Sequence, residues 1–297
     1  MASRTCPPKE TPVDARLSPA QIRLTRRTAA YWRVTFDNPP LNVMGPEMVR
    51  QFQRLIATIE ADEAVRVVVF DSAVDGFFLN HSDFRSPIEE MTSLPPGATG
   101  LPPWPDFLAR LTRAPVVSIA LIRGRATGNG SEILLACDMG FVSREKAVIS
   151  QWEVGVGMVA GGGPMARLPD LIGRNRAMEV LLGSDDIRGE QAEAYGYVNR
   201  ALPDAELDAY VDALATRISG FDKWAIAQTK RLVNTSLPAD LELGAGWDAC
   251  IASLGRPAAQ DGIRALTERG FQSPGDVENR LGFHLGEIAD QARSAGR

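Results

Sequence analysis

Between residues 128 and 138 the chain reads Gly-Asn-Gly-Ser-Glu-Ile-Leu-Leu-Ala-Cys-Asp, which places two glycines at a turn ahead of an apolar run of helical length. The N-terminus of such a helix offers unpaired N–H groups and the positive end of a dipole, so it can hold an anion. Glu132 stands in the first turn of this helix, among residues that should be buried. It is either an ordinary N-terminal helix acid, stabilised by the dipole, or a functional carboxylate.

A second isolated acid, Glu153, follows in the stretch Ser-Gln-Trp-Glu-Val-Gly-Val-Gly from residue 150 to residue 157. Taken alone, this acid is most simply a surface-loop residue. Two carboxylates beside oriented N–H groups, however, suit proton transfer next to a carbonyl whose oxygen becomes negative. The chain has only two histidines, His81 and His284. Nucleophilic triads use histidine as the base and zinc sites need several His or Cys ligands, so the sequence favours neither. We therefore expect carboxylates to carry any acid–base chemistry, and we expect no metal site.

The composition is that of a globular protein of 297 residues, 44% of them hydrophobic, with a net charge of -5. The chain can bury a full core, and its acidic balance argues against a nucleic-acid partner. Three widely spaced cysteines, Cys6, Cys137 and Cys250, form neither a disulfide framework nor a CxxC metal site, as is typical of the cytoplasm. The longest apolar run, residues 114–122, is too short to span a bilayer. We expect a cytoplasmic protein with no membrane partner.

Periodicity divides the chain into three regions. Residues 1–20 begin as MASRTCPPKETPVDARLSP, a polar and Pro-rich stretch expected to form a disordered N-terminal tail. Residues 21–200 alternate short strands with helices, as an α/β core does. Residues 201–297 are expected to form a C-terminal helical region. The segment 91–105 is rich in Pro and Gly and is expected to be mobile.

Individual elements follow from the same patterns. We expect strands at 31–36, 65–70, 115–122, 140–143 and 147–150. We expect helices at 46–61, 107–113, from 130 onward, 164–172, 174–182, 189–195, 204–219, 222–235 and 240–270. The helix 204–219 carries an apolar stripe at Leu207, Val211, Leu214 and Ile218. Core packing and a subunit interface explain this stripe about equally well.

Several blocks in order resemble the crotonase superfamily, also called the enoyl-CoA hydratase/isomerase family. The resemblance covers about residues 21 to 271, and its strongest block is the Gly-rich turn, acid and helix of residues 122–138. Further blocks are Gln151-Trp152-Glu153 with the glycines that follow, Arg167-Leu168-Pro169, Ile172-Gly173-Arg174 and Ala192-Glu193-Ala194. The resemblance implies an α/β fold, a crotonase-like spiral of β-β-α turns. The C-terminal α-helical region would then serve trimerisation, giving a homotrimer or a hexamer.

The resemblance also implies a ligand and a site. The ligand is a CoA thioester, an acyl-CoA or enoyl-CoA substrate, and no further cofactor is expected. Backbone N–H groups of Ser82 and Asn129 fall on the family's oxyanion hole, which binds the thioester oxygen. Glu132 and Glu153 fall on the two catalytic glutamates of the hydratases. Residues that flank the two N–H groups are expected to contact substrate or CoA: Asn80, His81, Asp83, Gly128 and Gly130.

Two positions depart from the family pattern. The first loop reads Leu79-Asn80-His81-Ser82, where small residues and a glycine are usual, and Asn129 replaces the middle glycine of the second motif. Asn tolerates left-handed geometry better than most residues, and the donor is a backbone group, so the site can survive. His81 is either a bulky loop substitution or a contact to CoA or substrate.

Retention of both glutamates favours an enoyl-CoA hydratase, a hydro-lyase that adds water across the 2,3 double bond. Glu132 would deprotonate the attacking water, and Glu153 would give a proton to the α-carbon. The alternatives are a double-bond isomerase, another acyl-CoA reaction through an enolate, and a non-catalytic crotonase-fold binding protein. The two retained glutamates and the acidic balance disfavour the last.

Overall fold

The computed structural model describes residues 20–295. The large sheet has the strand order β1-β2-β3-β4-β6-β9, and a small sheet has the order β5-β7-β8. All neighbouring pairs are parallel except β1–β2 and β7–β8. The large sheet consists of β1 (Ile22–Arg26), β2 (Tyr31–Phe36), β3 (Val67–Ser72), β4 (Val117–Ile122), β6 (Met139–Ser143) and β9 (Arg200–Leu202); the small sheet of β5 (Arg125–Thr127), β7 (Val148–Ser150) and β8 (Ile187–Arg188).

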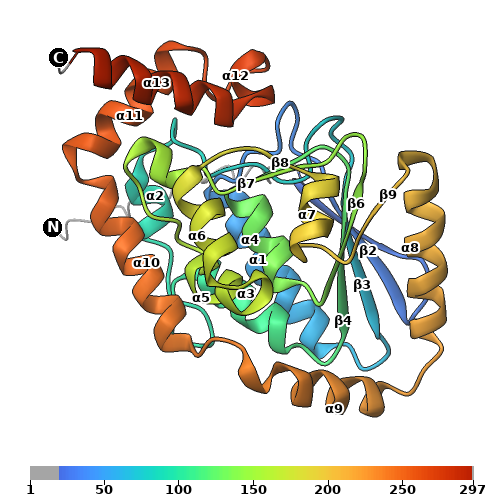
Figure 1. The fold of residues 1–297 in the computed structure, drawn as a ribbon. Helices are drawn as coiled ribbons and strands as arrows, with labels where there is room; N and C mark the ends of the chain where they lie inside the picture. Colours follow the sequence, from blue (N-terminus) through green and yellow to red (C-terminus); the bar gives the residue numbers. More distant parts are fainter. Residues whose placement is uncertain (1–19, 296–297) are drawn as a thin grey trace, which may run out of the picture.

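The central strands are apolar on both faces because both faces are covered, as is usual in parallel sheets. In β3, Val68 and Phe70 point into the main core with α1 (Pro46–Ala61) and α3 (Pro103–Arg113). Val67 and Val69 point the other way, toward α8 (Asp204–Ser219). Figure 1 shows the large sheet between these two helical layers.

The apolar stripe of residues 204–219 belongs to this packing. Leu207 and Val211 are fully buried against the large sheet, and Leu214 and Ile218 pack beside them. Of the two explanations left open by the sequence, core packing within the chain is therefore the right one.

The chain alternates between the two sheets. It passes from β4 in the large sheet to β5 in the small one, then through α4 (Asn129–Ala136) back to β6 in the large sheet and β7 in the small one. The helices α5 (Pro164–Ile172) and α6 (Arg174–Gly183) follow, and β8, α7 (Gly189–Tyr195) and β9 complete the winding. This confirms the expected spiral of β-β-α turns.

The C-terminal third wraps around the core as a long helical strap. The strap descends along α8, crosses under the core through α9 (Lys223–Val233) and rises on the far side through α10 (Asp240–Leu254) and α11 (Pro257–Glu268) (Figure 1). It ends in α12 (Asp276–Asn279) and α13 (Leu281–Ala295), which lie over the end of the core opposite α9. None of the helices within residues 20–295 is long and apolar enough to cross a membrane.

The structure corrects several expected elements. The helix expected at 240–270 is two helices, because the chain breaks at Gly255 and Arg256 and restarts at Pro257. The segment 91–105, in which no helix was predicted, contains the end of α2 (Ile88–Thr92) and the start of α3 at Pro103. The expected boundary between residues 200 and 201 falls inside β9, which pairs with β6. The expected N-terminal tail lies, apart from Ala20, outside the described residues.

Candidate active site

The helix α4 places Glu132 in the interior. Gly128 precedes the helix with φ +53, and the Glu132 N–H donates to the Gly128 carbonyl at 2.9 Å. The Glu132 side chain is only 2% exposed. Its carboxylate accepts three hydrogen bonds, from Trp104 Nε1 at 2.6 Å, from Asn129 Nδ2 at 3.1 Å and from the Gly162 N–H at 2.6 Å. Burial raises the pKa of Glu132, although these three donors act to lower it.

The second acid, Glu153, lies in very different surroundings. It begins a short 3-10 turn (Glu153–Val156) and is 8% exposed. Its Oε2 is buried and meets no hydrogen-bond partner within the described residues. Burial, together with the charge of nearby Glu132, raises the pKa of Glu153 to about 8. Three donors suit an ionised Glu132, whereas the absence of donors to Oε2 suits a Glu153 that holds a proton at neutral pH.

The two acids share one small cavity of about 50 Å³ with Ser82 and Asn129. The other lining residues include Phe84, Trp104, Trp152, Met158 and Trp247. The structure thus brings together the four residues to which the sequence assigned the chemistry. They come from loop 80–84, the start of α4 and the turn after β7.

Backbone geometry leaves the N–H groups of Ser82 and Asn129 available. Met44 pairs with Ser82 in a parallel bridge, in which the Met44 N–H donates to the His81 carbonyl and the Asp83 N–H donates to the Met44 carbonyl, both at 3.0 Å. This pairing uses the groups on either side of Ser82 and turns the Ser82 N–H away from Met44. Asn129 is the first residue of α4, so its N–H has no acceptor within the helix. Ser82 Oγ also donates to Asn129 Oδ1 at 2.8 Å, which ties the two loops together.

The two glycines that flank Asn129 are required by close packing. A Cβ on Gly128 would lie 2.8 Å from Glu153 Oε1. A Cβ on Gly130 would overlap the Leu79 carbonyl oxygen. Glycine is therefore required at both positions, because a side chain at either would collide with the residues that form the site.

The other residues assigned to substrate or CoA contact divide into two groups. Asp83 lines a cavity of about 720 Å³ next to the small one, and its carboxylate accepts from the Arg85 N–H and from Ser86 Oγ. Asn80 and His81, in contrast, are buried and point toward Glu278 on α12. Neither of them lines the two cavities described here.

The larger cavity shares five residues with the small one, namely Ser82, Phe84, Met158, Trp247 and Cys250. Its remaining walls are mostly apolar and come from α2, α10 and α11, through Ile88, Met91, Ile251, Leu254 and Ile263. The carboxylate pair thus lies beside a space large enough for an apolar group. The C-terminal strap supplies much of that space.

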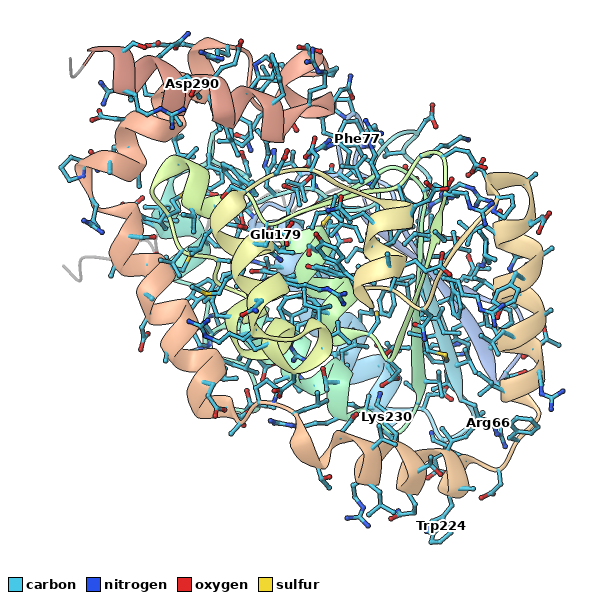
Figure 2. All side chains as sticks on the ribbon, viewed as in Figure 1. Arg66, Phe77, Glu179, Trp224, Lys230 and Asp290 are labelled. Atoms are coloured by element: carbon cyan, nitrogen blue, oxygen red, sulfur yellow. The ribbon has the colours of Figure 1, made fainter. Side chains whose placement is uncertain are left out.

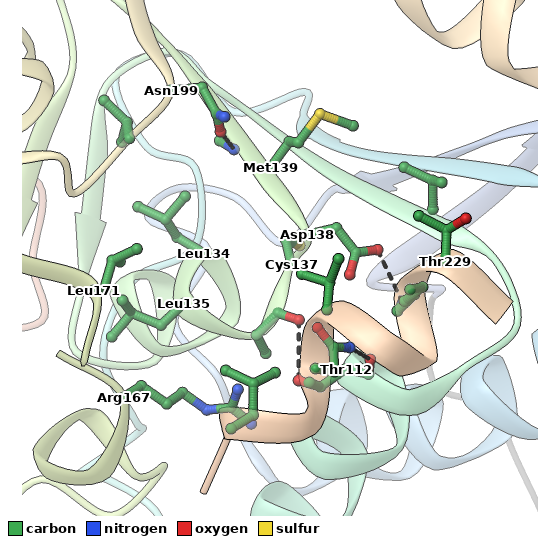
Figure 3. Close-up of a pocket in the computed structure, with 18 of the residues that line it drawn as sticks. Thr112, Leu134, Leu135, Cys137, Asp138, Met139, Arg167, Leu171, Asn199 and Thr229 are labelled. Carbon is green, nitrogen blue, oxygen red and sulfur yellow. Dashed lines mark hydrogen bonds and ion pairs between the residues drawn. The ribbon is translucent and has the colours of Figure 1, made fainter. Parts of the chain in front are cut away.

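A further cavity of about 920 Å³ lies elsewhere, between α4, α5 and α9 (Figure 3). Its lining includes Leu134, Cys137, Arg167 and Thr229, and neither Glu132 nor Glu153 is among the lining residues. We therefore place the candidate active site at the smaller pair of cavities, where the acids are.

Sequence reasoning missed three contributors to the site: Trp104, Gly162 and Glu278. Trp104 and Gly162 donate hydrogen bonds to Glu132. In the sequence, Trp104 is marked only by a proline on each side, and Gly162 is the middle one of three consecutive glycines. Glu278 lies beyond the end of the family resemblance, in a part of the expected helical region for which no individual helix was predicted.

The β-β-α spiral with its buried carboxylate pair is the architecture of the crotonase superfamily. A family model described as Enoyl-CoA hydratase/isomerase matches residues 26–269. The chain belongs to that family.

Several relatives agree with this assignment. A solved structure of a Streptomyces avermitilis protein, provisionally named an enoyl-CoA hydratase, is 40% identical with a TM-score of 0.85, and the match covers 90% of this chain and 96% of that one. The crotonyl-CoA hydratase of Syntrophomonas wolfei is 27% identical, over 80% of this chain and 91% of the relative. The short-chain-enoyl-CoA hydratase of Clostridium acetobutylicum is 27% identical, over 73% of this chain and 82% of the relative.

Proposed function

We propose that this protein adds water across the 2,3 double bond of an enoyl-CoA thioester. The observation that carries the proposal is the contrast between two neighbouring acids. Glu132 has three donors that stabilise its anion, while Glu153 has a buried oxygen with no donor within residues 20–295; burial raises the pKa of both acids, to about 8 for Glu153. One acid is thus suited to accept a proton and the other to donate one, at the same cavity.

In the proposed reaction the thioester oxygen sits on the N–H groups of Ser82 and Asn129. These donors polarise the conjugated carbonyl, so the β-carbon becomes electrophilic. They stabilise the negative oxygen of the enolate more than the neutral carbonyl, and this difference raises the rate of the chemical step. The dipole of α4 acts in the same direction, because its positive end lies at Asn129.

The proton balance uses one acid on each carbon. Glu132 takes a proton from water as the water oxygen bonds to the β-carbon and the double-bond electrons move into the enolate. Glu153 then gives its proton to the α-carbon, and the carbonyl reforms. Transfer of the proton from Glu132 to Glu153 through solvent restores the starting state. These steps need no metal or redox cofactor, and CoA enters as part of the substrate.

We propose that the cavity of about 720 Å³ binds the acyl group of the substrate and that this group is apolar. Its walls from α2, α10 and α11 offer aliphatic and thioether side chains, which favour burial of hydrocarbon.

We also propose that the protein assembles as a homotrimer or a hexamer. Large apolar side chains are exposed on α5, α6 and α9 and in the turn just before α9: Leu171, Met178, Leu182, Phe221, Trp224, Leu232 and Val233. Trp224 is 71% exposed and extends from α9 away from the core (Figure 2). Arg167 lines the 920 Å³ cavity nearby, is 5% exposed, and its Nε has no partner within residues 20–295. A second copy would cover such a surface.

Turnover of crotonyl-CoA tests the reaction. We expect the absorbance of the conjugated enoyl thioester to fall and a 3-hydroxyacyl-CoA to form. Conversion of a 3-enoyl-CoA to its 2-enoyl isomer, without hydration, would favour the isomerase alternative instead. Binding of acyl-CoA thioesters without turnover of any enoyl-CoA would favour the non-catalytic alternative.

A further inference from the structure

The loop that carries Ser82 is held by a carboxylate from the far end of the chain. Glu278 lies on α12 and is 1% exposed. Its oxygens accept from Asn80 Nδ2 at 2.8 Å and from the Gln272 N–H at 2.7 Å, and His81 Nε2 lies 3.2 Å from both of them. Two of these three partners belong to loop 80–84 itself.

His81 connects the carboxylate to the backbone of Ser82. Its Nδ1 lies 3.0 Å from the Ser82 carbonyl oxygen, and its Nε2 faces Glu278. Each ring nitrogen of His81 therefore meets an oxygen, one from the loop backbone and one from α12. The rings of Phe271, Trp152 and Phe84 surround it, with centroids 4.3, 5.5 and 6.4 Å away.

The carboxylate is suited to remain ionised in this setting. Burial alone would raise the pKa of Glu278, but His81 and the donors Gln272 and Asn80 hold it below its ordinary value. Both oxygens of Glu278 have partners, namely Asn80, His81 and the Gln272 N–H.

Gln272 provides a second connection between the strap and the loop. Its Nε2 donates to the Ser82 carbonyl at 3.0 Å, and its Oε1 accepts from the Phe84 N–H at 3.1 Å. Met44 fixes the peptide plane before Ser82, and His81 and Gln272 fix the one after it. The direction of the Ser82 N–H is thus set from both sides.

We propose that Glu278 is a positioning residue that aims the Ser82 N–H into the cavity of Glu132 and Glu153. It acts through Asn80, His81 and Gln272 and does not touch the substrate. The inference rests on the proposed function, because it concerns the donor that would bind the thioester oxygen. Such a donor lowers the barrier only if it is already held in place when charge develops.

The test is Glu278→Gln, with Glu287→Gln as the matched control. Glu287 also lies in the C-terminal strap, but it pairs with Arg269 on the surface, away from loop 80–84. A glutamine offers one acceptor oxygen where three partners converge, so the loop should lose its fixed position. We expect kcat to fall by about tenfold, a part of the loss caused by deleting such a donor, with KM within about twofold. The control should match the natural protein.

A double-mutant cycle with His81→Gln separates positioning from general packing. If Glu278 acts through His81, the double variant should lose little more kcat than the worse single variant. Independent losses that multiply would overturn the inference. A lowered Tm in Glu278→Gln, with kcat of the folded protein unchanged, would also overturn it.

A binding measurement distinguishes this inference from the hydration proposal. Butyryl-CoA labelled with ¹³C at the thioester carbonyl cannot be hydrated, and its resonance reports polarisation by N–H donors. We expect a downfield shift with the natural protein and a smaller one with Glu278→Gln. If the natural protein shows this pattern but hydrates no enoyl-CoA, only the hydration proposal fails. If the natural protein hydrates and the two shifts are equal, only the present inference fails. A natural protein that gives no shift overturns the present inference, whereas the hydration proposal is judged by turnover of crotonyl-CoA alone.

Discussion

Glu132 and Glu153 have the same side chain and differ only in what their oxygens meet. Replacement of either by glutamine is nearly isosteric and removes one proton-transfer step. We expect Glu132→Gln and Glu153→Gln each to lower kcat for crotonyl-CoA by about a hundredfold or more, the scale for a positioned acid or base. Glu89→Gln, an exposed change on α2, should retain native turnover. Near-native hydration by either active-site variant would remove that residue from the mechanism.

The raised pKa of Glu153 makes both turnover and stability depend on pH. If Glu153 must hold a proton, kcat should decline as the pH rises above about 8. The pKa is 4.5 in the reference state and about 8 in the folded protein, so between these values the folded protein retains a proton that the unfolded chain has lost. The stability from this group is complete below pH 4.5 and is lost as the pH rises through 8.

Thermal unfolding between pH 5 and pH 9 tests whether ionisation of Glu153 lowers the stability of the folded protein as the pH rises. The Tm of the natural protein should fall more over this range than the Tm of Glu153→Gln, because the amide cannot ionise. At pH 9 the variant should be the more stable of the two proteins. Parallel Tm profiles would show that Glu153 ionises in the folded protein as it does in the unfolded chain.

At the scale of elements, the turn before α5 acts directly on Glu132. Gly162 donates its N–H to Glu132 Oε1, and a Cβ at this position would overlap the carboxylate. We expect Gly162→Ala to displace Glu132 and to lower kcat by at least about tenfold, since small misplacements of catalytic groups are costly. Gly183→Ala is the control, because a Cβ there meets no atom within 4 Å. Equal turnover by the two variants would contradict the role given to the Gly162 turn.

Local patterns predicted most of the elements that build the site. The helix 46–61 has a proline at its start and an apolar stripe, and α4 follows a Gly-rich turn, so both appear in the sequence as they do in the structure. The end of the strap was harder to predict because α12 is only four residues long and both α12 and α13 begin beyond the family resemblance. The contact between His81 and Glu278 could not be predicted from the sequence either. It joins positions separated by 197 residues, and no local signal links them.

At the scale of the whole molecule, the exposed apolar surface around α9 predicts an assembly. The stripe on α8 cannot serve it, since the large sheet already buries Leu207 and Val211. We expect light scattering at micromolar concentration to give a trimer or a hexamer. Trp224→Glu should shift the population toward smaller species, and Leu24→Glu, on the edge strand β1, should not. A stable mass near 32.1 kDa for the natural protein would contradict the proposed assembly.

The strap also sets the moment at which a newly made molecule can reach its full activity. Asn80 and its partner Glu278 are 198 residues apart, and a ribosome needs about 10 to 40 s to add that many residues at typical rates. Throughout this interval the nascent chain already carries Ser82, and later both acids, but not the Glu278 carboxylate that secures the loop of Ser82. Turnover should therefore reach its full rate only once α12 has been synthesised and has docked against loop 80–84.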